Sequence, residues 1–278
     1  MPVNDELGIR MKTYYEQVPK TKLMRRTPVA IRIDGKAFHT FTKGFQKPFD
    51  EVLIKAMQNT MKYLCEHIHG CVLGYHQSDE ITLILVDYKN LNSDAWFDYE
   101  VQKMCSIAAS MATMAFNRFF YKNVCSFNSV NCRKWIEDSE LRKQRAEYID
   151  TLYRACEKGA MFDARVFNIP KEEVTNLIYW RQLDATKNSI QMVGQANFSH
   201  KKLQNKSCNV IQDMLMTEKG INWNDYPTHL KRGSCCIKKS FKINEGTEQE
   251  TIRNKWVIDM DIPIFTQDKD YINKLIFI

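Results

Sequence analysis

An alternating strand that runs into an Asp-Gly pair sets the strongest limit on how this chain folds. In VAIRI (residues 29–33), large apolar side chains alternate with Ala30 and Arg32, which is the period of a β-strand. Asp34 ends the strand, and Gly35 permits a sharp turn or the close approach of another group. Asp-Gly is also common at simple turns. Whether the pair marks a site therefore depends on a second acidic cluster facing it.

The order of the remaining segments predicts the fold class. Apolar residues at helical spacing predict helices, and a tight HQSD turn between two apolar runs predicts a hairpin. The order strand-helix-strand-strand-helix-strand indicates an α+β protein, in which one sheet is covered on one face by two helices. The segments are a short helix over 5–15, a helix that Asp50 can cap, strands over 71–75 and 80–86, a helix over 96–120, a strand over 161–169, and an interrupted helix from Pro170 to about residue 215.

Length and composition limit the class of protein. The 278 residues are enough for one large domain or two small ones, and the clearest breaks are the polar stretch 126–145 and the loop after Gly220. Forty Lys and Arg against thirty-three Asp and Glu give a net charge of +7, which fits a polyanionic partner but also ordinary solubility.

The N-terminal residues lack a signal peptide's apolar core, and no run could span a bilayer, so we expect no membrane partner. Nine cysteines without a CxxC pair favour reduced thiols and a cytoplasmic location, with a mitochondrial one left open.

The second acidic cluster, Ser78-Asp79-Glu80, lies at the tip of the hairpin. Strands joined through one helix are usually sheet neighbours, which can place Asp34 beside Asp79. Close carboxylates are unfavourable unless a cation neutralises them, and Mg²⁺ binds through one or two carboxylates plus phosphate oxygens. Neighbouring strand residues point to opposite faces, so Asp79 is the predicted direct ligand and Glu80 a ligand or support. The alternative interpretation is that these residues only make the turn polar.

Three co-linear motifs carry a family resemblance over residues 32–239. RIDGKAFHTFTKGFQKPFD, GYHQSDE and FDARVFNIP…YWRQLD together resemble the tRNA-histidine guanylyltransferase family of 3′–5′ polymerases. The resemblance implies a polymerase-palm-like antiparallel sheet with helices packed on one face, plus a C-terminal α/β extension. It divides the chain into a catalytic domain, 1–135, and a C-terminal domain, 136–278, that completes the sheet and contacts tRNA. Such a transferase uses two Mg²⁺ ions, which the resemblance assigns to Asp34, the Gly35 carbonyl and Asp79, with Glu80 as a further catalytic residue.

The family's nucleotide pocket maps onto residues whose chemistry suits it. Lysines can neutralise phosphates, Phe38 offers a stacking face, and hydroxyl, imidazole and carboxylate groups can form hydrogen bonds. The alternatives are that Phe38 belongs to the core and that Lys36 is only solvated. The predicted nucleotide-binding residues are Lys36, Phe38, His39, Lys47, Asp50, Ser78 and Asn188.

Basic residues in the second half of the chain are candidate RNA contacts. Each of them alone is as compatible with a solvated surface, but on a chain suspected of acting on tRNA some should touch phosphates. The sequence lacks the signatures of common sequence-reading RNA modules, so recognition of RNA shape and ends is expected. The predicted RNA-binding residues are Arg181, Lys187, Lys201, Lys202 and Lys206.

One departure from the family pattern points to a branch. Members that add one guanylate to tRNA-histidine carry W-R-Q-x-D followed by C-H-I-N-N-L-Y-N. This chain keeps the first motif (residues 180–184) and then reads ATKNSIQ (185–191), in which only Asn188 fits. We therefore predict the guanylyltransferase-like branch, which repairs 5′-truncated tRNA by template-directed addition after ATP activates the 5′-monophosphate, with ATP and GTP or other nucleoside triphosphates as substrates. The resemblance also implies a homotetramer.

Other functions and sites were weighed. Non-templated guanylate addition to tRNA-histidine is the alternative within the family, a nucleotide cyclase is an alternative enzyme, and a non-catalytic RNA-binding protein is the alternative of another class. His67, His69 and Cys71 would share one face of a strand and could imitate a zinc site. Because no partner motif accompanies them, we do not predict zinc.

Overall fold

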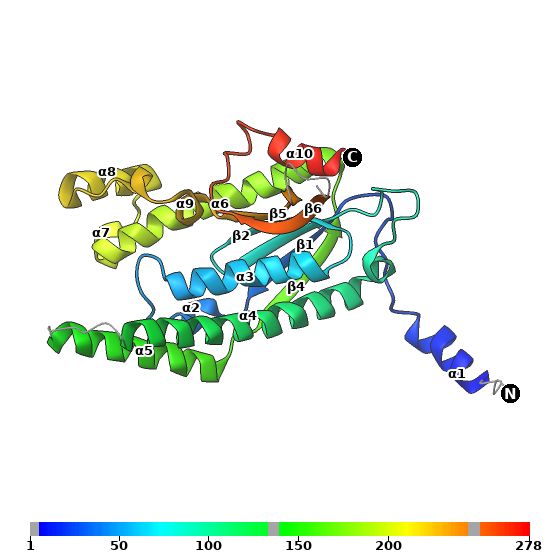
Figure 1. The fold of residues 1–278 in the computed structure, drawn as a ribbon, viewed down its shortest axis with the longest axis horizontal. Coiled ribbons are helices and arrows are strands. Elements are labelled where there is room, and N and C mark those ends of the chain that lie inside the picture. Colours follow the sequence, from blue (N-terminus) through cyan, green and yellow to red (C-terminus); the bar gives the residue numbers. More distant parts are fainter. Residues whose placement is uncertain (1–5, 133–138, 244–250) are drawn as a thin grey trace.

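A single six-stranded antiparallel sheet organises the computed structural model, which describes residues 6–132, 139–243 and 251–278. The antiparallel α+β class predicted from the sequence is confirmed. β4 and β6 are the two edge strands (Figure 1). The strand order is β4-β1-β3-β2-β5-β6, with β1 Val29–Gly35, β2 Cys71–Gln77, β3 Glu80–Leu85, β4 Phe162–Asn168, β5 Ser234–Ile243 and β6 Thr251–Asp259.

The predicted helices over 5–15 and after Asp50 are present, whereas the segment predicted as one helix over 96–120 forms a 3₁₀ turn, Trp96–Tyr99, followed by α4, which continues to Cys132. Asp50 caps α3 as expected, because its side chain accepts a hydrogen bond from the Leu53 N–H at 3.0 Å. The helices are α1 Glu6–Met11, continued by a π turn Lys12–Glu16, α2 Phe38–Phe41, α3 Glu51–His67, α4 Val101–Cys132, α5 Ser139–Lys158, α6 Lys171–Asn197, α7 His200–Leu203, α8 Cys208–Lys219, α9 Thr228–Arg232 and α10 Asp270–Ile276, with short 3₁₀ turns at Trp96–Tyr99 and Trp223–Asp225.

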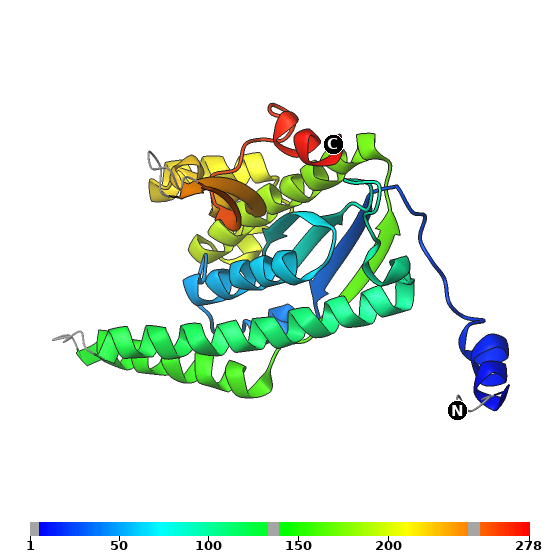
Figure 2. The same cartoon turned by 45° about the vertical axis from the view of Figure 1, so that its right-hand side comes forward.

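One face of the sheet is covered by α3 and α4 (Figure 2). The large apolar residues of β1, such as Ile31 and Ile33, point to this side and are fully buried. Ala108 and Ala112 of α4 are also fully buried, and their small side chains let the helix lie close to the sheet. This face is therefore the one that the alternation of β1 predicts.

The opposite face is covered as well, so the prediction of helices on one face only is wrong. Figure 2 shows α6 and α10 on the side away from α3 and α4. Ala30 of β1 and Ile84 of β3 pack there with Ile178 of α6 and Ile272 of α10 in a second core. The physical reason is that the strands carry apolar residues in both alternating positions, which requires burial on both sides.

The polar stretch 126–145, predicted as a break, contains the end of one helix and the start of another. α4 continues to Cys132, and α5 begins at Ser139, so most of the stretch is helical. The two helices form a hairpin that extends past the end of the sheet (Figure 1). The predicted boundary at 135/136 lies outside the described residues, and both predicted parts contribute strands to the one sheet.

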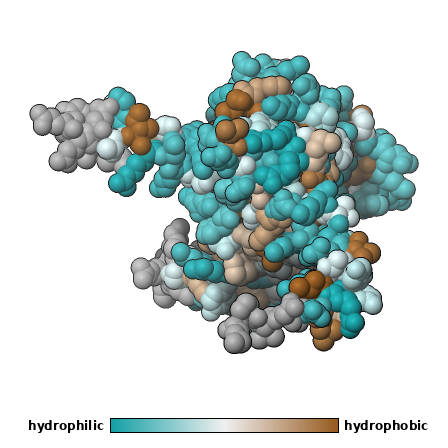
Figure 3. Space-filling model, turned by 90° about the vertical axis from the view of Figure 1, so that its right-hand side faces the viewer, coloured by the Kyte–Doolittle hydropathy of each residue, from teal (hydrophilic) through white to brown (hydrophobic). Residues whose placement is uncertain are grey.

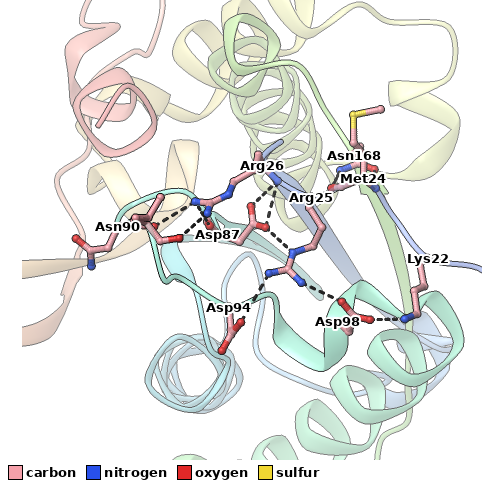
Figure 4. Close-up of polar contacts among 10 residues, drawn as sticks. Lys22, Met24, Arg25, Arg26, Asp87, Asn90, Asp94, Asp98 and Asn168 are labelled. Carbon is pink, nitrogen blue, oxygen red and sulfur yellow. Dashed lines mark hydrogen bonds and ion pairs between the residues drawn. The ribbon is translucent and has the colours of Figure 1, made fainter.

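The segment before β1 is fastened to the far end of β3 (Figure 4). The carboxylate of Asp87 is fully buried, accepts from the Arg26 backbone N–H at 2.9 Å and pairs with Arg25 Nε at 2.9 Å. The Arg26 guanidinium donates to the backbone carbonyls of Asn90 at 3.1 Å and Leu91 at 2.6 Å. These contacts anchor β1 at the end opposite to Asp34.

The residues before this anchor project from the body of the protein in Figure 2, and in the view of Figure 3 they lie toward the viewer. α1 has no buried residue, and apolar side chains such as Leu7 and Ile9 lie at its surface. Within residues 6–132, 139–243 and 251–278, no helix combines the length and the apolar character needed to cross a membrane.

Candidate active site

Three carboxylates form a row across the sheet at the end of β1. Asp34 lies directly opposite Glu80 of β3 and, on its other side, opposite Asp163 of β4. Directly opposed residues of antiparallel strands share a face, so the three side chains lie on the side of α6. The hairpin therefore meets β1 through its second strand, β3, and the sequence reasoning did not anticipate Asp163.

The hairpin tip presents Ser78 and Asp79 beside this row. A two-residue turn joins Gln77 to Glu80, and Ser78 adopts a φ of +51°, a left-handed conformation that is uncommon outside glycine. The Ser78 hydroxyl lies 3.0 Å from Asp79 Oδ1 and donates to it. Strained turns persist where the surrounding structure holds them, and here the turn carries a predicted metal ligand.

The side chain of His76, on β2, holds the backbone of this turn in place. Burial lowers its pKa to about 4, so the ring is neutral near pH 7. Its Nε2 lies 3.0 Å from the Ser78 carbonyl oxygen, and a neutral ring protonated at Nε2 donates to that oxygen. The buried imidazole is thus a fixed support for the backbone of the turn.

The carboxylates of the site differ in how their charge is balanced. Burial, then the charges of Glu80 and Asp163, raise the pKa of Asp34 above its usual value. Burial raises the pKa of Asp79 as well, and the charge of Asp34 adds to this shift. Burial alone would raise the pKa of Glu80, but the Arg32 hydrogen bond and the Arg181 charge bring it below its usual value. Asp34 and Asp79 are therefore the two carboxylates of the site that form no ion pair among the described residues.

This electrostatic pattern fits a divalent cation at Asp34 and Asp79 but not at Glu80. Within its described residues the structure brings together no group of three His, Cys, Asp or Glu side chains that could by itself hold a metal ion. Mg²⁺ typically takes one or two carboxylates and completes its shell with water and substrate phosphates. The two unbalanced carboxylates suit that mode of binding. Glu80 is instead held by cationic side chains, which favours the supporting role over the ligand role.

Gly35 is required by the packing rather than by a turn. A Cβ at this position would lie 2.2 Å from Cδ2 of the Phe38 ring. The left-handed residue that reverses the chain is Ala37, with a φ of +52°. The sequence reasoning foresaw a close approach or a sharp turn at Gly35, and the structure shows the close approach.

A cavity of about 510 Å³ opens beside the two unbalanced carboxylates. Its walls come from the loop after β1, the hairpin tip and the C-terminal half of α6. It brings together most of the predicted nucleotide-binding residues, and it adds polar residues that were not among the predicted contacts, such as Gln46 and Gln195. The predicted residues that line it are Asp34, Gly35, Phe38, His39, Lys47, Asp50, Ser78 and Asp79.

Three predicted nucleotide contacts have other roles or positions in the structure. The Phe38 ring is 6% exposed and packs against Phe41, Phe116 and Phe162, which matches the alternative that it belongs to the core. Asp50 is buried and caps α3. Lys36 is exposed and is not among the residues lining the cavity.

Asn188 lines a second, smaller cavity next to the first. This cavity also contains His76, Ser78 and Ala185, so Asn188 lies on the far side of the hairpin tip. Met192 of α6 borders both cavities and connects them. Asn188 therefore faces a space adjacent to the larger cavity.

Arg181 is part of an ion-pair cluster around Glu80. Its guanidinium contacts Glu80 Oε2 and pairs with Asp184 Oδ2 at 2.7 Å, while Arg32 Nη2 pairs with Glu80 Oε1 at 2.7 Å. The Arg181 side chain is only 7% exposed. This burial argues against the predicted direct contact of Arg181 with RNA and indicates that it positions Glu80.

The predicted RNA-binding lysines lie at the surface near the end of α6. Lys187 is exposed on α6, and Lys206 lines a groove together with Gln191 and Gln195. Lys201 is also exposed, whereas Lys202 forms an ion pair with Glu218. The three other lysines thus remain available for phosphate groups.

The premise of a possible zinc cluster is wrong. His67 is the last residue of α3, and Cys71 is the first residue of β2, so the two do not alternate with His69 along a strand. His67 Nδ1 instead lies 2.7 Å from the Tyr63 carbonyl oxygen.

Comparisons with known proteins agree with this architecture. The sequence model of the Thg1 family, described as tRNAHis guanylyltransferase, matches residues 9–170. A solved structure described as a bacterial tRNA(His) guanylyltransferase (Thg1)-like protein in complex with ATP is 41% identical, with a TM-score of 0.77, over 97% of this chain and 98% of that one. A structure of a bacterial Thg1-like protein in complex with GTP is 37% identical, with a TM-score of 0.75, over 99% of this chain and 100% of that one. The tRNA(His) guanylyltransferase of Saccharomyces cerevisiae is 26% identical over 76% of this chain and 82% of its own length.

Proposed function

Because the chain belongs to the tRNA(His) guanylyltransferase family, and is therefore a nucleotidyltransferase, we propose that it restores missing nucleotides at the 5′ end of truncated tRNA under the direction of the opposing strand. Family membership leaves no place for the alternatives of an idle RNA-binding protein or a nucleotide cyclase. The choice that it leaves open is between templated repair and the addition of one guanylate to tRNA-histidine.

The observation that carries this choice is the surface of α6 beside the site. Where guanylate-adding members follow W-R-Q-x-D with C-H-I-N-N-L-Y-N, this chain places Ala185, Asn188 and Ser189 against the second cavity. None of these small neutral side chains replaces the histidine of the other pattern. They provide few hydrogen-bonding groups that could distinguish one base from another. Pairing with the opposing strand can supply the selectivity instead.

The reaction consists of two phosphoryl transfers at the acidic row. The RNA 5′-phosphate attacks the α-phosphorus of ATP and pyrophosphate leaves, which gives an adenylylated 5′ end. The 3′-hydroxyl of the incoming triphosphate then attacks that 5′ phosphorus and AMP leaves, so the new 5′ end carries the triphosphate. Catalysis of such transfers is chiefly positioning and charge stabilisation.

The residues of the larger cavity are placed for these tasks. Lys47 offers a cation to the triphosphate, and the Ser78 hydroxyl lies beside Asp79 at the mouth of the turn. Asp34, Asp79 and the Gly35 carbonyl would hold the two predicted Mg²⁺ ions, which supply charge neutralisation and favour ionisation of the attacking hydroxyl. Arg32 and Arg181 hold Glu80 and thereby fix the strand that carries the turn.

The test offers tRNAs that lack the first nucleotide, with a 5′-monophosphate and each of the four bases opposite the gap, together with Mg²⁺, ATP and all four triphosphates. Asp79→Asn serves as the inactive control. Incorporation that follows the complementary base supports templated repair. Addition of guanylate alone, to tRNA-histidine alone, would reject it in favour of the other activity of the family.

A further inference from the structure

Trp180 is an exposed aromatic residue beside the acidic row that the mechanism does not use. It lies on α6, its residue is 46% exposed, and it lines neither of the two cavities at the hairpin tip. The guanidinium carbons of Arg32 and Arg181 lie 5.2 Å and 4.5 Å from the centre of its ring. An indole in this position is held in place without being covered.

The two arginines beside the indole are tied to the sheet. Both guanidinium groups bind the single carboxylate of Glu80, one at each oxygen. Since Glu80 is part of the sheet, the two cations beside the ring are held at the sheet. The indole is still 46% exposed, and aromatic side chains flanked by cations are common stacking sites for nucleobases.

A cation on the edge strand β4 completes this surface. Arg165 lies directly opposite Arg32, and Asp163 lies opposite Asp34, so all four side chains share the face of Trp180. Two arginines in directly opposed positions repel each other unless anions separate them. The Arg165 side chain is 64% exposed, and its one ion pair among the described residues is a 3.7 Å contact with Asp163. Arg165 is therefore available to an anionic ligand.

Asp34 connects this surface to the nucleotide cavity. Its carboxylate lines the cavity on one side, and on the other it experiences the charges of Asp163 and Arg165. Nucleotide addition needs two substrates at the same carboxylates. The cavity can hold the triphosphate, and the surface of Trp180 and Arg165 lies on the other flank.

We propose that Trp180 and Arg165 form a platform for the 5′-terminal nucleotide of the RNA, with the base stacked on the indole and the phosphate bound by the guanidinium. The proposal rests on the proposed function in that RNA is the second substrate. Neither Trp180 nor Arg165 is among the RNA-binding residues predicted from the sequence. In this proposal Arg165, rather than the buried Arg181, is the arginine that binds RNA.

The same side of α6 continues toward the predicted RNA-binding lysines. Lys187 and Gln191 follow Trp180 by about two and three helical turns and are both exposed. Gln191 borders the groove that contains Lys206. An RNA strand whose end lies on Trp180 would therefore pass over polar and cationic groups.

The test compares Trp180→Ala, Trp180→Phe and Arg165→Gln with Tyr121→Ala and Arg118→Gln, which change an exposed aromatic residue and an exposed arginine on α4, across the sheet. Binding of 5′-monophosphorylated tRNA is measured without nucleotide by fluorescence anisotropy, and KM is measured for RNA and for the triphosphate. We expect Trp180→Ala to raise the Kd and the KM for RNA about tenfold, from the lost stacking of one base, and to leave the KM for triphosphate unchanged. Trp180→Phe should restore most of the binding. Arg165→Gln should reduce the slope of log Kd against log salt by about one phosphate contact.

Unchanged RNA affinity in Trp180→Ala would overturn the proposal, as would a fall in kcat alone that Trp180→Phe does not correct, since Trp180 would then only hold the arginines at Glu80. The binding measurement is independent of the choice between family activities. If the wild-type protein adds only guanylate to tRNA-histidine, the repair function is rejected, while a tenfold loss of affinity for that RNA in Trp180→Ala still supports the platform.

Discussion

Asp79 and Glu80 are adjacent acidic residues, but only the removal of Glu80 should lower the stability of the fold. Glu80→Ala leaves the guanidinium groups of Arg32 and Arg181 without their shared carboxylate. Asp79→Asn removes a carboxylate whose pKa is raised by burial, so its charged form is unfavourable in the folded protein. We expect both variants to lose nucleotide addition, but only Glu80→Ala to lose stability.

The magnitude follows from the burial of the ion pairs. Removing one partner of a buried ion pair costs about 3–5 kcal/mol. Arg181 keeps its pair with Asp184, and the Arg32 side chain is 21% exposed, so a value near the lower limit is expected. Glu80→Ala should therefore lower the free energy of unfolding by about 3 kcal/mol. Asp79→Asn should leave it unchanged or raise it.

The measurement is urea denaturation of each variant at pH 7, combined with a double-mutant cycle of Glu80→Ala and Arg181→Met. A coupling free energy of at least about 1 kcal/mol is expected for contacting residues of one ion-pair network. Glu80→Gln keeps the size of the side chain and should lie between wild type and Glu80→Ala. If Asp79→Asn destabilises the protein as much as Glu80→Ala, the assignment of different charge balance to the two carboxylates is wrong.

Three further predictions concern the surroundings of the site. Gly35→Ala should lower the free energy of unfolding by about 1–3 kcal/mol and reduce activity, because its Cβ would displace a Phe38 ring already packed against other rings; an unchanged urea midpoint would contradict this. His76 has a folded-state pKa of about 4 against 6.5 for the free side chain, so the unfolded state binds more protons between these values and stability falls as the pH is lowered. The wild type should lose on the order of 2 kcal/mol more than His76→Gln between pH 7 and pH 5 in urea denaturation, and equal losses would refute the role of His76. EDTA should abolish nucleotide addition and Mg²⁺ should restore it. Activity that persists in EDTA would contradict the assignment of metal ions to Asp34 and Asp79.

Much of the local structure could be read from the chain because the interactions that form it are short-range. The alternation in residues 29–33, the Asp50 cap and the hairpin around Ser78 each depend on neighbours within a few positions, and all three are present. The three spaced motifs were enough to identify the family. The acidic pair and most of the cavity lining followed from them.

Contacts between distant segments could not be obtained in this way. The pairing of β1 with β3 and β4 places Glu80 and Asp163 opposite Asp34, and this register depends on residues that are far apart in the chain. The second helical layer depends on how α6 and α10 pack against the sheet, which no local pattern specifies.

The roles of the basic residues show the same division. Arg181 is predicted from the sequence as an RNA contact, yet folding brings it, together with Arg32, to Glu80, where burial makes pairing with a carboxylate necessary. Arg165 has the same side chain but lies on an edge strand and stays exposed. The sequence determines which side chains carry a charge. Long-range packing determines whether a carboxylate lies close enough to pair with each arginine or leaves it exposed.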